Sequence, residues 1–136
     1  MNIRLWTTIL LVFGGVSIAL IGLSALIAPD LLAAPLGFAL DNTSALNEFR
    51  ANYGGMLLLL GMLTAAGGLR SQWHRPALYL LLCFTAGLVL GRLVSIVLDG
   101  APGVALYIFG GFELFGATAA ALLLRCYDRD CPADPA

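Results

Sequence analysis

The feature that most constrains this chain is a series of apolar stretches, each of about 20 residues or more. A helix that crosses the ~30 Å hydrocarbon core of a bilayer needs about 20 mostly apolar residues, because each residue adds ~1.5 Å. No stretch alternates between apolar and polar residues, so membrane-spanning strands are not favoured. The sequence therefore predicts an all-α four-helix transmembrane bundle, with helices at residues 5–27, 46–69, 76–98 and 104–124.

The composition separates this chain from water-soluble domains. Of its 136 residues, 60% are hydrophobic and only 11% are charged, whereas lipid can solvate the apolar outside of a helical bundle. We expect one transmembrane domain, residues 1–125, followed by a disordered cytoplasmic tail, residues 126–136. The basic residues are scattered arginines and the net charge is -1, which argues against a nucleic-acid partner.

The arginines predict how the helices are oriented. Short cytoplasmic segments of membrane proteins are enriched in basic residues. If the four helices alternate in direction, one side of the membrane collects the arginines near the helix ends: Arg4, Arg70, Arg75, Arg125 and Arg129. We therefore expect both termini in the cytoplasm and the chain in a bacterial inner membrane. Residues 5–27 also suggest a signal peptide, but they exceed the apolar region of about 7 to 15 residues that such peptides have.

The connections between the predicted helices differ in character. Residues 70–75 and 99–103 are short, and the second contains Gly and Pro, so both predict helical hairpins. Residues 31–40 are apolar but interrupted by Pro35 and Gly37, and are too short to cross a bilayer. We expect them to form a loop at the outer interface, with a lid over the bundle as the alternative.

A group of charged residues is expected in the outer half of the bundle: Glu48, Arg50, Arg92, Asp99 and Glu113. At ~1.5 Å per residue, Arg92 and Glu113 lie about 9 Å and about 14 Å below the outer surface. Charges at this depth are costly and turn towards partners, so we predict that Glu113 accepts hydrogen bonds from Arg92. Tyr53 follows the first two charges, and Ser95 shares a helix face with Arg92. A structural ion pair and a ligand site require the same burial, so both interpretations stay open.

Small residues recur at a four-residue spacing in the third predicted helix, at Gly87, Gly91, Ser95 and Asp99. This spacing lets helix backbones approach closely in lipid. Similar contacts are expected from other glycines: Gly14, Gly15, Gly54, Gly55 and Gly116. We favour packing within the chain, with a dimer interface as the alternative.

Residues that bind metals or carry out catalysis are sparse. Cys83 is expected to pack within a helix, and Cys126, Cys131 and His74 lack the usual spacing of zinc ligands. No phosphate-binding loop, dinucleotide fingerprint or nucleophile elbow occurs. We expect no cofactor, no metal and no catalytic residue; an enzyme that uses Glu113 as an acid or base ranks last among the interpretations.

Two stretches, NEFRANYGGMLLLLG at 47–61 and GRLVSIVLDGAPG at 91–103, followed by FELFGA at 112–117, resemble a family of small bacterial four-helix membrane proteins. The family is catalogued as domain of unknown function 4345, and the resemblance covers nearly the whole chain except the tail. It implies a shared bundle but no activity. The family elements match these positions: Glu48, Arg50, Tyr53, Gly54, Gly55, Arg92, Ser95, Asp99, Gly100 and Glu113.

These observations favour a binding or transport-related role in the membrane. Arg92 and Arg50 would hold a lipid or a small anionic or amphipathic ligand, with Glu113 and Asp99 orienting the two arginines. The alternative is an accessory or structural subunit, in which the charges hold the helices together and the glycines dock onto a second copy or another membrane protein.

Overall fold

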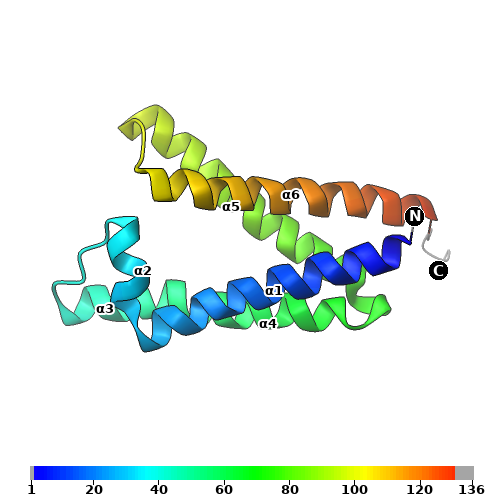
Figure 1. Ribbon diagram of the computed structural model, residues 1–136, viewed down its shortest axis with the longest axis horizontal. Helices are drawn as coiled ribbons and strands as arrows, with labels where there is room; N and C mark the ends of the chain where they lie inside the picture. Colours follow the sequence, from blue (N-terminus) through cyan, green and yellow to red (C-terminus); the bar gives the residue numbers. More distant parts are fainter. Residues whose placement is uncertain (1, 131–136) are drawn as a thin grey trace.

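The computed structural model describes residues 2–130 (Figure 1). Within this range no strand occurs, and the expected all-α class is confirmed. The helices in chain order are α1 (Ile3–Ile27), α2 (Pro29–Leu36), α3 (Thr43–Phe49), the π-helix η1 (Arg50–Met56), α4 (Leu57–Gly68), the 3₁₀ turn η2 (Ser71–Trp73), α5 (His74–Asp99) and α6 (Val104–Asp130). We call the end that holds the start of α1 and the end of α6 the termini end, and the opposite end the α2 end.

Helix α1 packs closely along η1 and α4. A Cβ atom at Gly15 would lie 2.4 Å from the backbone nitrogen of Ala65, and one at Gly61 would lie 2.3 Å from that of Ala19. These positions therefore accept only a hydrogen atom as a side chain. Such close approach maximises van der Waals contact, which is a main source of helix association in lipid.

The second predicted helix, residues 46–69, corresponds to α3, η1 and α4, which follow one another without a break from Thr43 to Gly68. Within residues 2–130, three helices are long and apolar enough to cross a membrane: Ile3–Ile27, Ser71–Asp99 and Val104–Tyr127. The Thr43–Gly68 segment is not one of them, because each of its three parts is short. The intervening π-helix is a rare element that is frequent at functional sites.

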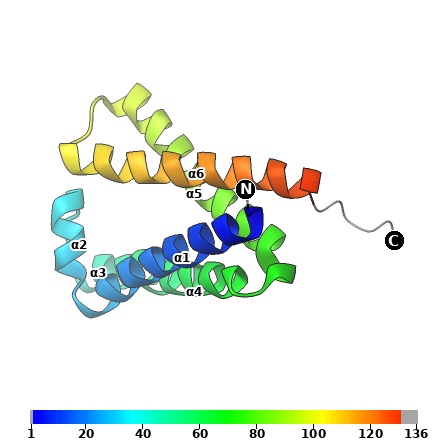
Figure 2. The same ribbon diagram turned by 45° about the vertical axis from the view of Figure 1, so that its right-hand side comes forward.

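Helices α5 and α6 form an antiparallel hairpin that is anchored to the rest of the chain at the termini end (Figure 2). Gly100, with a φ of 92°, ends α5 in a conformation that favours glycine. The buried residues of α5 all lie in its first half, and those of α6 all lie in its second half. They meet Leu11 of α1 in one core: Ala77, Leu78, Leu81, Ala120 and Leu124. The other halves of α5 and α6 contact mainly each other.

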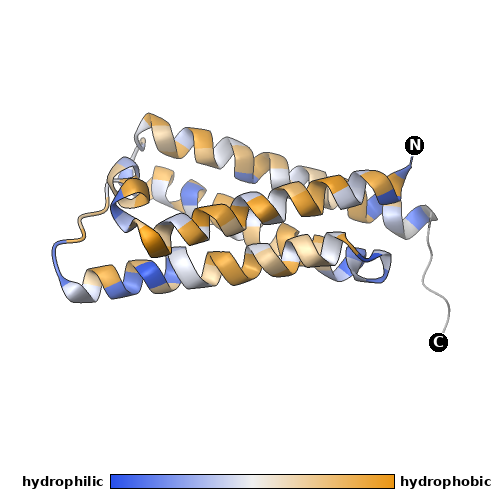
Figure 3. Cartoon of the chain, turned by 60° about the horizontal axis from the view of Figure 1, so that its bottom comes forward, coloured by the Kyte–Doolittle hydropathy of each residue, from blue (hydrophilic) through white to orange (hydrophobic). Residues whose placement is uncertain are grey.

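Hydrophobic residues cover the helices along most of their length, and hydrophilic residues are more frequent towards their ends (Figure 3). Many large apolar side chains are exposed on the outside, including Phe13, Leu63 and Val97, which are 75%, 64% and 81% exposed. Water would disfavour so much exposed apolar surface, whereas hydrocarbon chains solvate it. The exposed surface is therefore compatible with a membrane protein.

The first connection and the tail differ from expectation. Residues 29–36 form α2, because Pro29 is favourable at the start of a helix, and α2 packs against α1 and also contacts α6. The disordered tail expected from residue 126 is wrong for residues 126–130, where α6 continues to Asp130. Tyr127 stabilises this extension because it is buried and its hydroxyl donates to the carbonyl of Ser71 at 3.2 Å. Residues 131–136 lie outside the described range.

Candidate functional site

The centre of the candidate site is an ion pair between α5 and α6. Nε of Arg92 donates to Oε2 of Glu113 at 2.5 Å, and Nη2 donates to Oε1 at 2.6 Å. The hydrogen bonds predicted from sequence are therefore present, in the two-pronged geometry that only arginine offers a carboxylate. The Arg92 side chain is 27% exposed and that of Glu113 is 13% exposed. The pair is thus mostly buried, and a part of the Arg92 side chain stays exposed.

The hairpin brings this pair together. Residues 92 and 113 stand on helices joined by the short turn after Asp99, and the antiparallel arrangement places them side by side. Gly110 lies one turn before Glu113, and a Cβ atom there would lie 3.3 Å from Cδ of Arg92. A glycine at this position gives the arginine stem room to cross from α5 to α6.

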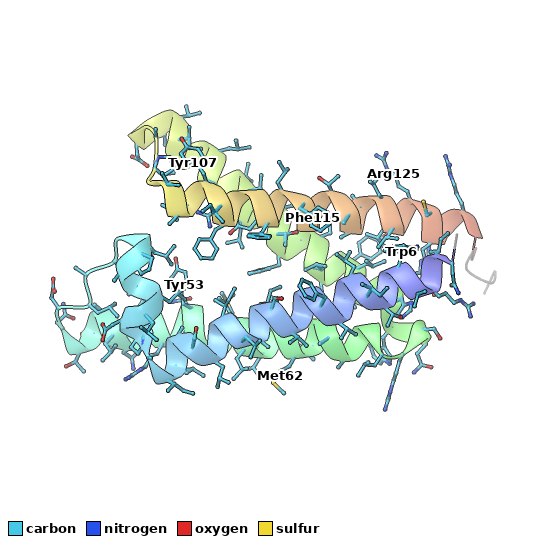
Figure 4. The ribbon with its side chains drawn as sticks, in the orientation of Figure 1. Trp6, Tyr53, Met62, Tyr107, Phe115 and Arg125 are labelled. Atoms are coloured by element: carbon cyan, nitrogen blue, oxygen red, sulfur yellow. The ribbon has the colours of Figure 1, made fainter. Side chains whose placement is uncertain are left out.

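Tyr53 approaches the ion pair from the other half of the molecule. It lies on η1, and its side chain points towards α6, the helix that carries Glu113 (Figure 4). Its ring stacks on Phe49 with 4.7 Å between centroids, and Phe38 meets it edge-on at 5.3 Å. Phe38 follows α2, so the first connection helps to fix Tyr53. We call Tyr53, Arg92 and Glu113 the outer polar site.

The structure does not bring the other predicted polar residues into this site. Glu48 accepts a hydrogen bond from Asn52, one turn later on the same helical segment, at 2.5 Å. Arg50 is exposed and makes no hydrogen bond or ion pair with any residue in the described range. Ser95 donates to Asp99 at 2.9 Å, also along one helix. Among the described residues, neither Arg50 nor Asp99 forms a hydrogen bond or ion pair with Arg92 or Glu113, so their joint action with Arg92 stays a prediction.

The glycines divide into packed and open positions. Gly54 is packed, since a Cβ atom there would lie 2.6 Å from Cδ2 of Leu26, and Gly116 faces Thr85. Gly55 has almost no neighbour. On α5, two glycines of the expected packing stripe have no close neighbour among the described residues: a Cβ atom at Gly87 or Gly91 would meet no atom within 4 Å.

Sequence reasoning missed a second polar group, at the termini end. His74 is 2% exposed. Its Nε2 lies 3.1 Å from the carbonyl oxygen of Gly68 and 3.3 Å from the hydroxyl of Thr8. Its ring meets that of Tyr127 edge-on, at a centroid distance of 6.0 Å. The signal available from sequence was a single histidine in a chain otherwise short of polar residues.

A comparison with family models matches residues 6–124 to the family described as Domain of unknown function (DUF4345). The chain belongs to this family. The match extends across α1 to α6 and includes all of the outer polar site, so the site is part of the DUF4345 domain itself. No curated protein matches the chain significantly, and no solved structure does so.

At this site the DUF4345 domain has hydrogen-bonding groups that are not all used within the ion pair. Arg92 retains N–H groups that do not bind Glu113, and the Tyr53 hydroxyl can both donate and accept. Within residues 2–130 no group of three or more His, Cys, Asp or Glu side chains is arranged to hold a metal ion.

Proposed function

We propose that this chain is a multi-pass protein of a bacterial inner membrane that binds a lipid or a small anionic or amphipathic molecule at the outer polar site. The observation that carries the proposal is the ion pair of Arg92 with Glu113, on helices whose surrounding surface is otherwise apolar. A charged pair in an apolar surface is costly to build. An exposed fraction of 27% at Arg92 leaves part of it open to a ligand.

The proposed topology has four crossings. The segment α3–η1–α4 supplies the fourth, since its 26 residues, Thr43 to Gly68, would extend about 39 Å at the helical rise. Both termini then lie in the cytoplasm, together with the arginines that flank the helices. The α2 end faces outwards, and the ion pair lies in the outer half of the membrane.

Cysteine labelling tests this topology. The native cysteines Cys83, Cys126 and Cys131 are first replaced by serine, and single cysteines are then placed at Gln72 and at Asp41. In intact cells a membrane-impermeant maleimide should label the cysteine at 41 and leave the one at 72 unlabelled until the cells are opened. Labelling of residue 72 in intact cells, with 41 protected, would reverse the orientation.

Native mass spectrometry tests ligand binding. The full chain, released from membranes in a mild uncharged detergent, should carry a bound molecule whose occupancy falls at least about tenfold in R92Q, a loss equivalent to about 1.4 kcal/mol. R125Q is the matched control, because Arg125 is an exposed arginine at the other end of α6. Equal occupancy in the parent chain and both variants would show that the outer polar site is not where the molecule binds.

A second candidate function is that of a subunit in a membrane complex. The open face of α5 at Gly87 and Gly91 favours it, because small residues without intramolecular neighbours allow another helix to approach closely. G91L should then dissociate a complex that survives mild detergent, whereas G111L, at another open position, should not. A particle that is monomeric before any substitution contradicts this role.

A further inference from the structure

The charge balance of the outer polar site restricts which ligands can bind there. This inference about the ligand rests on the ligand-binding function proposed above. Arg92 and Glu113 carry opposite unit charges and are joined by two hydrogen bonds. Arg50, the other arginine expected at the site, makes no contact with either residue within the described range. The site therefore has no net positive charge left with which to attract an anion.

An anionic head group would have to compete with Glu113 for the guanidinium. Glu113 is 13% exposed, so its carboxylate could not regain full hydration after losing Arg92. Leaving a buried charge without its partner is strongly unfavourable. Repulsion between the released carboxylate and the incoming anion would add to this cost. The geometry thus disfavours fatty acids and acidic phospholipids as ligands.

Uncharged oxygen atoms can bind without disturbing the pair. Nη1 of Arg92 and the second N–H of Nη2 are not used by Glu113. A carbonyl, ester or hydroxyl oxygen can accept from these N–H groups while the ion pair stays intact. The hydroxyl of Tyr53, on the opposite side, can donate to or accept from the same molecule.

The surroundings of the polar atoms suit an apolar body. Tyr53 is backed by the rings of Phe38 and Phe49. On the first half of α6, where no residue is buried, Tyr107 and Phe115 are 52% and 66% exposed. Long apolar chains of a ligand could therefore lie along this exposed apolar surface of α6 and continue into the surrounding lipid.

From these observations we infer that the ligand is an uncharged amphiphile, whose carbonyl, ester or hydroxyl oxygens bind Arg92 and Tyr53 while the carboxylate of Glu113 balances the positive charge of Arg92. In this arrangement Glu113 is a specificity-determining residue. It holds the guanidinium in place and excludes anions, so the same carboxylate serves both the stability of the hairpin and the selection of the ligand.

Photocrosslinking with matched lipids tests the inference. The full chain in uncharged detergent is incubated with diacylglycerol or with phosphatidic acid, each carrying the same photoactivatable acyl chain. Saturable labelling of peptides from η1 and the first half of α6 is then quantified by mass spectrometry. We expect diacylglycerol to label these peptides at least about tenfold more than phosphatidic acid at equal concentration, which corresponds to about 1.4 kcal/mol.

A charge variant sharpens the test. E113Q removes the carboxylate that balances Arg92, so the site gains a net positive charge, and the ratio of phosphatidic acid to diacylglycerol labelling should rise at least about tenfold. E48Q is the control, because Glu48 is an exposed carboxylate whose partner is Asn52, and its ratio should match that of the parent chain. If E113Q cannot be recovered in folded form, the preference of the parent chain decides the question alone.

The outcomes separate this inference from the function on which it rests. Saturable labelling by phosphatidic acid that equals or exceeds that by diacylglycerol in the parent chain overturns the uncharged class but leaves a lipid site in place. An unchanged ratio in folded E113Q overturns the role assigned to Glu113. Absence of saturable labelling by both lipids at η1 and α6 overturns the proposed binding function as well.

Discussion

The ion pair between α5 and α6 can be tested directly by removing each partner and then both. R92Q leaves Glu113 without a cation, and E113Q leaves Arg92 without an anion. Breaking a fully buried pair costs about 3 to 5 kcal/mol. Arg92 is 27% exposed and has a long stem that can reach more polar surroundings, so we expect each single variant to lose about 2 kcal/mol of unfolding free energy.

The double variant separates the pair from its individual residues. R92Q/E113Q removes both charges together, so no unpaired charge remains, and two neutral amides can still bond to each other. We expect a total loss of about 2 kcal/mol, which is about 2 kcal/mol less than two independent losses would give.

Reversible unfolding of the purified chain in mixed micelles, followed by far-UV circular dichroism, provides the unfolding free energies. A control cycle uses E48Q, R50Q and their combination, since Glu48 pairs with Asn52 and Arg50 has no partner among the described residues. The control cycle should be additive within about 0.5 kcal/mol. Additive losses at Arg92 and Glu113 would refute the argument that the two charges support each other.

Three further predictions concern packing and the termini end. G61A should destabilise the chain by about 1 to 3 kcal/mol in the same assay, because its methyl group would overlap the backbone of α1. G87A places its methyl group in open space and should be neutral or stabilising by up to about 1 kcal/mol. Equal effects of the two substitutions would contradict the packing assigned to α1 and α4. H74L should lower the unfolding free energy by about 1 to 3 kcal/mol, because it leaves a buried carbonyl at the end of α4 without a hydrogen-bond donor. The control Q72A, at an exposed residue, should change the unfolding free energy little. An H74L variant as stable as the parent chain would contradict the role of this hydrogen bond. Y127F should lower the unfolding free energy by about 1 kcal/mol, because the hydrogen bond to the η2 turn is lost. In limited proteolysis, the end of α6 should then be cut faster than in the parent chain. An unchanged cleavage rate would contradict the role of Tyr127 in holding this end of α6.

The sequence was informative about the pair for a specific reason. Arg92 and Glu113 stand out because charged residues are rare in apolar helices, and the short turn between the helices fixes their relative depth. The same reasoning grouped Arg50 and Asp99 with the pair, but no hydrogen bond or ion pair among the described residues joins either of them to Arg92 or Glu113. Depth along a helix follows from residue number, but the direction in which a side chain faces depends on how the helix is rotated against its neighbours.

The glycines illustrate the same limit. Gly61 and Gly87 lie in similar apolar sequences, yet one is in contact with a neighbouring backbone and the other has no neighbour within 4 Å. The π-helix at Arg50–Met56 was equally beyond prediction, because local propensities do not distinguish it from an α-helix. Its effect is to change which face of the segment Tyr53 occupies.

By itself, the sequence determined the all-α class, the apolar exterior and the approximate bounds of the long helices, since these follow from the local cost of placing each residue type in hydrocarbon or water. Tertiary structure alone decided which polar residues meet. Helices α5 and α6 bring Arg92 to Glu113, α2 and η1 bring Phe38 to Tyr53, and Arg50 is left apart. Those contacts depend on the rotation and separation of whole helices, which are set by backbone packing at residues distant in the chain, such as Gly15 and Gly61.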